Sequence, residues 1–185
     1  DPVLSRGLGD VYKRQGRILG SSKNIAKYIN SPESLIYQKS KVLYGIFESK
    51  QSIVKNDNCF LVEGYTDVIK MHQCGISNVV ASSGTALTEN QIRLINRLTK
   101  NITVVFDGDA AGSRAALRGI DLILEQGMNV KICNLPEGDD PDSFVSNTNL
   151  EEVQSYLNKN SKDFIVYKAS LLLDDSENDP VKKAA

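Results

Sequence analysis

The sequence predicts an α/β fold, with a mostly parallel four-stranded sheet flanked by helices. Short apolar runs rich in Val, Ile and Phe alternate along the body of the chain with longer amphipathic segments. Of its 185 residues, 41% are hydrophobic and 24% charged, which is the composition of a globular domain and not of a disordered chain. Strands and helices in strict alternation form right-handed crossovers, so the sheet is expected to be parallel and covered on both faces.

The N-terminal part is predicted to be a small basic segment that precedes the sheet. Residues 1–15 follow neither a helical nor a strand period, and we leave them unassigned, with a non-native leader as one interpretation. The stretch "GRILG" (16–20) predicts a short strand, and "KNIAKYINSPES" predicts a polar loop broken at Ser31-Pro32. Residues 35–50 have the pattern of an amphipathic helix.

The body contains the four strands of the predicted sheet. They fall at residues 59–64, 77–84, 101–107 and 129–135. The connecting helices are expected at residues 66–74, closed by Gly75, at 88–99, capped by Thr88, and at 110–126, ended by Gly127. Two further helices follow at 150–158 and 161–173.

These elements divide the chain into four parts after residue 15. They are a basic N-terminal part (16–57), a central α/β domain (58–147), a C-terminal helical extension (148–175) and a tail expected to fray (176–185). No window approaches the roughly 18 apolar residues of a membrane span, and no signal peptide is apparent. We therefore expect a cytoplasmic location and no membrane partner.

Charge is distributed unevenly along the chain. Residues 1–55 hold 10 Lys and Arg against 4 Asp and Glu, a net charge of +6, whereas residues 56–185 hold 12 against 19, a net charge of −7. This asymmetry indicates that polyanion contact and metal binding are divided between two regions. A solvated basic helix face would produce the same N-terminal excess, and charge alone does not separate the two interpretations.

The cysteines and the single histidine do not suggest a zinc site. Cys59, Cys74 and Cys133 form no CxxC pair, and we interpret them as reduced, buried small hydrophobes. His72 follows an apolar stretch at helical spacing, so a surface or partly packed position is expected.

Acidic residues follow three of the four predicted strands. Glu63 ends the first strand, Asp107 and Asp109 end the third, and Asp139, Asp140 and Asp142 lie in the "PEGDDPD" loop after the fourth. Asp67 lies one turn into the first helix of the body. Because the carboxyl ends of parallel strands meet at one edge of the sheet, these side chains are expected to converge there.

Gathered carboxylates repel one another unless a cation neutralises them. Hard oxygen ligands suit Mg²⁺ or Mn²⁺, and Gly108 between Asp107 and Asp109 leaves both carboxylates free to reach one ion. An EF-hand is excluded, since its fifth and twelfth positions would be Ala111 and Arg118. Helix capping by Asp107 or Asp109 and solvated loop acids remain alternatives.

Seven segments together resemble one family. The pairing of "EGYTD" with "DGDAAG" is similar to the Toprim fold, the metal-binding module of topoisomerases, primases and some nucleases. The segments "GRILG", "KYINSPES", "LYGI", "VEGYTDVI", "VASSGTALTENQ", "VVFDGDAAGSRAALRGI" and "LPEGDDPDSFV" resemble, in order and spacing, the RNA polymerase core of the bacterial DnaG-type primase. The resemblance covers about residues 16–158.

The resemblance implies a role for each acidic residue. Glu63 matches a metal ligand or general acid/base, Asp107 and Asp109 match a metal-binding pair, and Asp67, Asp140 and Asp142 match further acidic site residues. The implied cofactor is Mg²⁺ or Mn²⁺, in two or more ions. The implied reaction is template-directed synthesis of short RNA primers from ribonucleoside triphosphates on single-stranded DNA.

The resemblance also assigns the basic part and the partners. Nucleotide and template phosphates are expected at Arg17, Lys27, Tyr28 and Lys39. The family pattern places zinc in a preceding domain and contact with the replicative helicase in a following one. Neither domain is expected in this chain, so we expect it to synthesise primers weakly or not at all when it is alone. The expected place of action is the replication fork.

Two other functions stay open at this point. In a haloacid-dehalogenase-like phosphatase, Asp107 and Asp109 would be nucleophile and acid, but Ala111 stands where Thr or Val is expected, and Glu63 has no role. The second alternative is a non-catalytic Toprim module that binds metal or nucleic acid.

Overall fold

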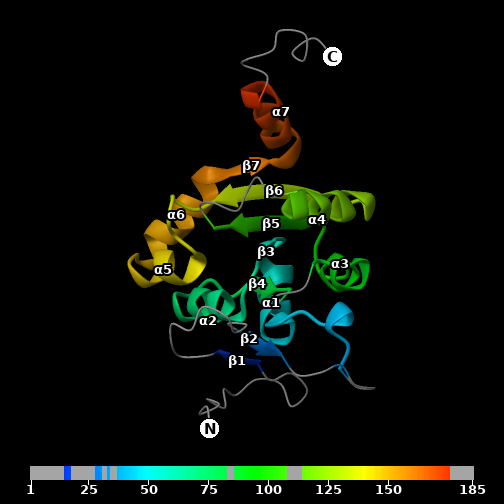
Figure 1. The fold of residues 1–185 in the computed structure, drawn as a ribbon. Coiled ribbons are helices and arrows are strands. Elements are labelled where there is room, and N and C mark those ends of the chain that lie inside the picture. Colours follow the sequence, from blue (N-terminus) through cyan, green and yellow to red (C-terminus); the bar gives the residue numbers. More distant parts are fainter. Residues whose placement is uncertain are drawn as a thin grey trace.

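The predicted α/β class is confirmed by a computed structural model, shown in Figure 1. The residues that the structure describes are 15–17, 28–30, 33, 37–82, 86–107 and 114–175. They form a five-stranded sheet covered by helices and a separate two-stranded ribbon. Among the described helices, none is both long and apolar enough to cross a membrane.

The main sheet has the strand order β4-β3-β5-β6-β7. Its strands are β3 (Cys59–Val62), β4 (Val79–Ala81), β5 (Asn101–Phe106), β6 (Asn129–Asn134) and β7 (Ser161–Asp163). The first four pair in parallel, as predicted, whereas β7 pairs antiparallel with β6. The predicted count of four strands was therefore wrong, because β7 is three polar residues long and carries no apolar period that would reveal it.

The central strands are buried on both faces. In β5 all four residues from Ile102 to Val105 are buried, and the hydroxyl of Thr103 donates to the side-chain oxygen of Asn58 at 3.1 Å. Strands covered on both faces consist of continuous β-branched runs without polar alternation. This explains why the sequence locates β3 and β5 closely.

In the described part of the chain, seven α-helices cover the sheet. They are α1 (Ile46–Asn56), α2 (Tyr65–Gln73), α3 (Glu89–Asn96), α4 (Arg114–Glu125), α5 (Pro141–Ser146), α6 (Leu150–Asn160) and α7 (Phe164–Asp175). In Figure 1, α2, α5 and α6 lie on one side of the sheet and α3 and α4 on the other. Each side has its own apolar core, one containing Val68 and Leu157 and the other containing Ile92 and Ile123.

Most helix ends agree with the sequence analysis. Thr88 caps α3 by accepting a hydrogen bond from the Gln91 N–H at 3.3 Å, and Gly75 and Gly127 follow α2 and α4 with positive φ. The helix predicted at 161–173 begins instead at Phe164, after β7. The loop after β6 contains the short helix α5, which the sequence did not predict.

The N-terminal predictions needed correction. The helix predicted over 35–50 was wrong, because this segment holds a 3-10 turn, η1 (Lys39–Lys41), and an extended stretch before α1 begins at Ile46. Gly45 has φ 79°, a left-handed conformation that interrupts any helix there. A second departure is β2 (Tyr28–Asn30), which lies in the predicted polar loop and pairs antiparallel with β1 (Gln15–Arg17).

Several predicted features lie outside the described residues. They include the leader before residue 15, the remainder of the strand predicted at 16–20, the start of the helix predicted at 110–126, and the tail from 176 onward.

Candidate functional site

The candidate site is formed where the parallel strands end. Glu63 follows β3 directly and is exposed, and Asp107 follows β5 directly and is half-buried. Asp140 and Asp142 lie at the start of α5, which packs against α2 (Figure 1). Three strand ends therefore deliver carboxylates to the same region, as parallel topology requires.

Asp67 is held in place by the first turn of α2. Its Oδ2 accepts a hydrogen bond from the Gly64 N–H at 2.9 Å, and the residue is only 7% exposed. Gly64 is the N-cap, where a Cβ atom would lie 2.8 Å from Asp67 Oδ2. The glycine therefore allows the carboxylate to fold back onto the helix start.

The pKa of Asp67 reports on its neighbours. Burial raises the pKa of this carboxyl from 3.8 to about 7, although the hydrogen bond from Gly64 lowers it. The negative charges of Asp107, Asp140 and Asp142 raise the same pKa further. The acids after β5 and β6 are thus within electrostatic reach of the acid on α2, as the sequence predicted.

Hydrogen bonds and one ion pair fix the acids of α5. Asp140 is the N-cap, and its Oδ1 accepts from the Ser143 N–H at 2.7 Å. Asp142 Oδ1 lies 3.9 Å from Lys70 Nζ on α2. Asp142 belongs to the first turn of α5, whereas the sequence analysis placed it in a loop.

The donors suit a hard, hydrated cation. Within the described residues, no three side chains of His, Cys, Asp or Glu lie close enough to hold one metal ion. Asp109 and the linking Gly108 lie outside the described residues, and so does the cap of α4. Mg²⁺ is commonly held by one or two carboxylates, several waters and substrate phosphates, so mutually repelling carboxylates at this edge fit such an ion.

The structure places three of the four predicted phosphate-binding residues, and Lys39 is the one whose hydrogen bonds it shows. Lys39 lies in η1, where its N–H donates to Glu33 Oε1 at 3.1 Å and its carbonyl accepts from Gln91 Nε2 at 3.0 Å. Arg17 and Tyr28 are opposite each other in the β1–β2 register. Lys27 lies outside the described residues.

Two contributors to the site are not predicted by the sequence. Lys70 brings a positive charge to Asp142, and Gly64 makes room for Asp67. The sequence contains a weak signal for Lys70: it lies one helical turn after Asp67, so both side chains are on the same side of the helix. The ion pair itself depends on α5 packing against α2, which no local pattern reveals.

The interpretation as buried, reduced thiols is confirmed for Cys59 and Cys133 but not for Cys74. The partly packed position of His72 is confirmed. Cys59 and Cys133 are buried free thiols, and burial raises the pKa of Cys133 to about 11. Cys74 is half-buried. His72 is partly packed, with Nε2 3.1 Å from the hydroxyl of Ser49.

Two family profiles match the chain. One is described as Toprim-like and covers residues 60–145, and the other is described as the N-terminal domain of the DNA primase catalytic core and covers residues 8–50. The second match begins inside the segment 1–15 that the sequence analysis left unassigned.

Relatives and solved structures agree with these profiles. A DNA primase of Staphylococcus aureus strain COL is 43% identical over 180 residues, which are 95% of this chain and 30% of the relative. A DNA primase domain from Pseudomonas aeruginosa superposes with a TM-score of 0.81 at 36% identity, covering 92% of this chain and 53% of that domain. A DnaG primase catalytic domain bound to single-stranded DNA gives 0.78 at 32% identity, covering 93% and 56%.

The chain spans less than a third of the length of the curated relatives it matches. The matches nevertheless extend over nearly all of its residues, and they include both the acidic edge of the sheet and the basic N-terminal part. The chain belongs to the DnaG-type DNA primase family, and residues 60–145 are its Toprim-like part.

Proposed function

We propose that this chain is the catalytic part of a primase that synthesises short RNA primers on a single-stranded DNA template. The observation that carries the proposal is the convergence on Asp67 of charges from Asp107, Asp140 and Asp142, which follow two different strands. The relatives named DNA primase support it. The comparisons do not favour the phosphatase alternative.

The acids are proposed to act together on phosphoryl transfer. Glu63, Asp107 and Asp109 would be the catalytic carboxylates, and with Asp67, Asp140 and Asp142 they would hold two or more Mg²⁺ or Mn²⁺ ions. Such ions, when bound, lower the pKa of an attacking 3′-hydroxyl and stabilise charge on the leaving oxygen. By holding these ions, the carboxylates of the chain would align the 3′-hydroxyl with the α-phosphate for in-line attack.

The basic N-terminal part is proposed to hold the substrates. Ribonucleoside triphosphates and template phosphates would contact Arg17, Lys27, Tyr28 and Lys39. Single-stranded DNA and the RNA primer are the remaining direct partners in this proposal. Helicase contact and zinc binding are assigned to other domains of a longer protein acting in the cytoplasm at the replication fork.

The test is nucleotide incorporation on a primed single-stranded template, with Mn²⁺ or Mg²⁺ and with EDTA. A template that already carries a primer avoids the initiation step, in which a separate zinc domain is expected to take part. We expect weak, metal-dependent incorporation that Asp107→Asn and Glu63→Gln reduce at least tenfold, whereas Glu151→Gln, an exposed acid on α6, leaves it unchanged.

Calorimetry of Mn²⁺ binding to the same variants separates metal binding from nucleotide incorporation. If Mn²⁺ binds equally well to wild type, Asp107→Asn and Glu63→Gln, these acids hold no metal ion and the proposal is wrong. Equal incorporation by wild type and both site variants would likewise contradict it.

A further inference from the structure

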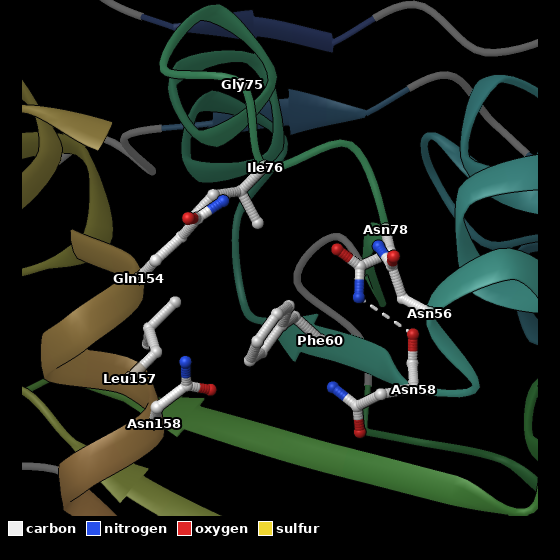
Figure 2. A pocket seen from close by; sticks show the side chains of 9 residues that line it. All are labelled: Asn56, Asn58, Phe60, Gly75, Ile76, Asn78, Gln154, Leu157 and Asn158. Atoms are coloured by element: carbon white, nitrogen blue, oxygen red, sulfur yellow. Dashed lines mark hydrogen bonds between the residues drawn. The ribbon is translucent and has the colours of Figure 1, made fainter. Parts of the chain in front are cut away.

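A cavity of about 300 Å³ lies away from the acidic site (Figure 2). Its polar lining consists of amide side chains, contributed by Asn56, Asn58, Asn78, Gln154 and Asn158. Asn58 precedes β3 and Asn78 precedes β4, whereas Glu63 follows β3. The cavity therefore lies toward the amino ends of these strands, opposite the edge that gathers the carboxylates.

Two of the amides are fixed by the fold. Asn78 is 5% exposed, and its Nδ2 donates to the Asn58 carbonyl at 2.8 Å, the contact drawn in Figure 2. Asn58 Oδ1 accepts from the hydroxyl of Thr103 at 3.1 Å. These bonds position the asparagine side of the cavity before any ligand arrives.

The other three amides belong to exposed residues and are not used in bonds among the residues that the structure describes. Within the described part of the chain, no hydrogen bond involves the side chains of Asn56, Gln154 or Asn158. Each offers both a donor and an acceptor. None of the described residues that line the cavity is charged, so a phosphate or carboxylate would lose water there without gaining a counter-charge from them.

The apolar part of the lining consists of one aromatic ring and two aliphatic side chains. The ring of Phe60 lies between the α6 residues and the asparagines in Figure 2, and it is only half-buried. Leu157 and Ile76 beside it are buried in the core. A half-buried aromatic ring surrounded by amides presents a stacking surface and polar groups at its edges.

We propose that this cavity binds one unstacked nucleobase. A base has a neutral π-face that stacks on an aromatic side chain and an edge of donors and acceptors that amides can match. An added peptide strand would need a free sheet edge, but at the outer strand β4 the Val79 carbonyl already accepts from the Ser49 hydroxyl at 2.7 Å, and Ala81 pairs with Tyr44. The base can belong to a free nucleoside or to a single strand.

The test follows side-chain amide signals by ¹H–¹⁵N NMR in EDTA, with adenosine, guanosine, cytidine and uridine as separate probes. A hexadeoxynucleotide and an abasic strand of equal length are then used as probes in the same titration. We expect saturable shifts at the cavity amides with at least one probe that carries bases. The double variant Gln154→Ala, Asn158→Ala should weaken binding at least fivefold, whereas Gln51→Ala, which removes an exposed amide from α1, should not.

The outcomes separate the sources of the base. Shifts with a nucleoside indicate a free ligand, and shifts with the hexanucleotide alone indicate a base within a strand; both support the proposal. Equal binding of the abasic strand, equal binding by the double variant, or no shift with any probe would overturn it. Because EDTA removes divalent ions, the result is independent of the proposed catalytic function.

Discussion

Asp67 is the residue on which the electrostatics of the acidic site converge. Its carboxyl is buried, it accepts a hydrogen bond from the N–H of the N-cap Gly64, and the charges of three further carboxylates raise its pKa. With a pKa of about 7, it retains a proton in much of the metal-free population near neutral pH. A bound divalent cation would displace that proton, which couples metal affinity to pH.

This raised pKa makes stability depend on pH in a defined direction. The pKa of Asp67 is about 7 in the folded chain against 3.8 for the free side chain, so the folded state binds the extra proton between these values. The contribution of Asp67 to the free energy of unfolding is fully present below about pH 4. It is lost as the pH rises toward 7, because the buried carboxyl must then ionise. In EDTA at pH 8, Asp67→Asn should therefore be more stable than wild type, by on the order of 1–4 kcal/mol.

Urea unfolding at pH 4 and pH 8 measures this difference. The variant and wild type should unfold at similar urea concentrations at pH 4, where both side chains are neutral. Glu125→Gln, which neutralises an exposed acid on α4, should show no such pH-dependent gain. A wild type more stable than Asp67→Asn at pH 8 would mean that the Asp67 carboxylate is stabilised by its surroundings.

Lys70 affects the same site through charge. Its Nζ lies 3.9 Å from Asp142 Oδ1, and the two side chains are 40% and 35% exposed, so the pair contributes only ~0–1 kcal/mol to stability. Lys70→Ala removes a cation that competes with a metal for Asp142. We expect Mn²⁺ affinity measured by calorimetry at low salt to rise about threefold, and Lys55→Ala on α1 to leave it unchanged. A fall in affinity would show that Lys70 assists metal binding.

At the scale of elements, Gly45 decides where α1 begins. It is the left-handed N-cap of α1, and a Cβ atom there would lie 2.8 Å from Val68 Cγ1 and 3.2 Å from the Val79 carbonyl oxygen. The left-handed conformation itself costs a non-glycine residue about 1–2 kcal/mol. The close approach of α2 and β4 adds a steric cost, because those atoms belong to the core.

Gly138 provides a matched comparison. It has φ 85°, and a Cβ atom there would meet nothing within 4 Å. Gly138→Ala should therefore cost only the conformational strain, whereas Gly45→Ala should cost that strain plus about 1–3 kcal/mol of overpacking. Thermal and urea unfolding measure both losses. Equal losses would mean that Val68 and its neighbours move aside freely.

The sequence predicted the elements whose signals are local. The strands at 59–64 and 101–107 are continuous apolar runs, and Thr88 marks a helix start by its own side chain. Prediction from the sequence failed where contacts between distant segments decide the structure. The apolar spacing over 35–50 satisfies a helical period, yet Tyr44 pairs with Ala81 and Gly45 turns the chain.

The site was predictable to the same extent. Parallel strands place Asp107, Asp140 and Asp142 at one edge, so topology alone brought these acids near Asp67. Topology does not specify that the loop after β6 forms the short helix α5. It also does not specify that Lys70 pairs with an acid of that helix. Those features depend on the packing of α2 against α5, which is a contact between distant segments.

At the scale of the whole molecule, the N-terminal part and the sheet are linked by a few polar contacts. Gln91 on α3 is fully buried, and its Nε2 donates to the carbonyls of Lys39 and Val42 at 3.0 and 2.9 Å. The hydroxyl of Thr88 donates to the Ser40 carbonyl at 2.6 Å. The start of α3 therefore holds η1, and with it the position of Lys39.

This link predicts that substrate binding can be weakened without touching the carboxylates. Gln91→Met fills a similar volume but leaves two carbonyls unbonded, at a cost of about 1–3 kcal/mol each, so η1 should loosen. We expect the affinity for a fluorescent ribonucleoside triphosphate to fall about tenfold while Mn²⁺ affinity is unchanged, because the acids lie on other elements. Gln51→Met, at an exposed position on α1, should change neither affinity. A parallel fall in both affinities would mean that η1 supports the acidic site itself, whereas unchanged triphosphate binding would remove Lys39 from the proposed substrate contacts.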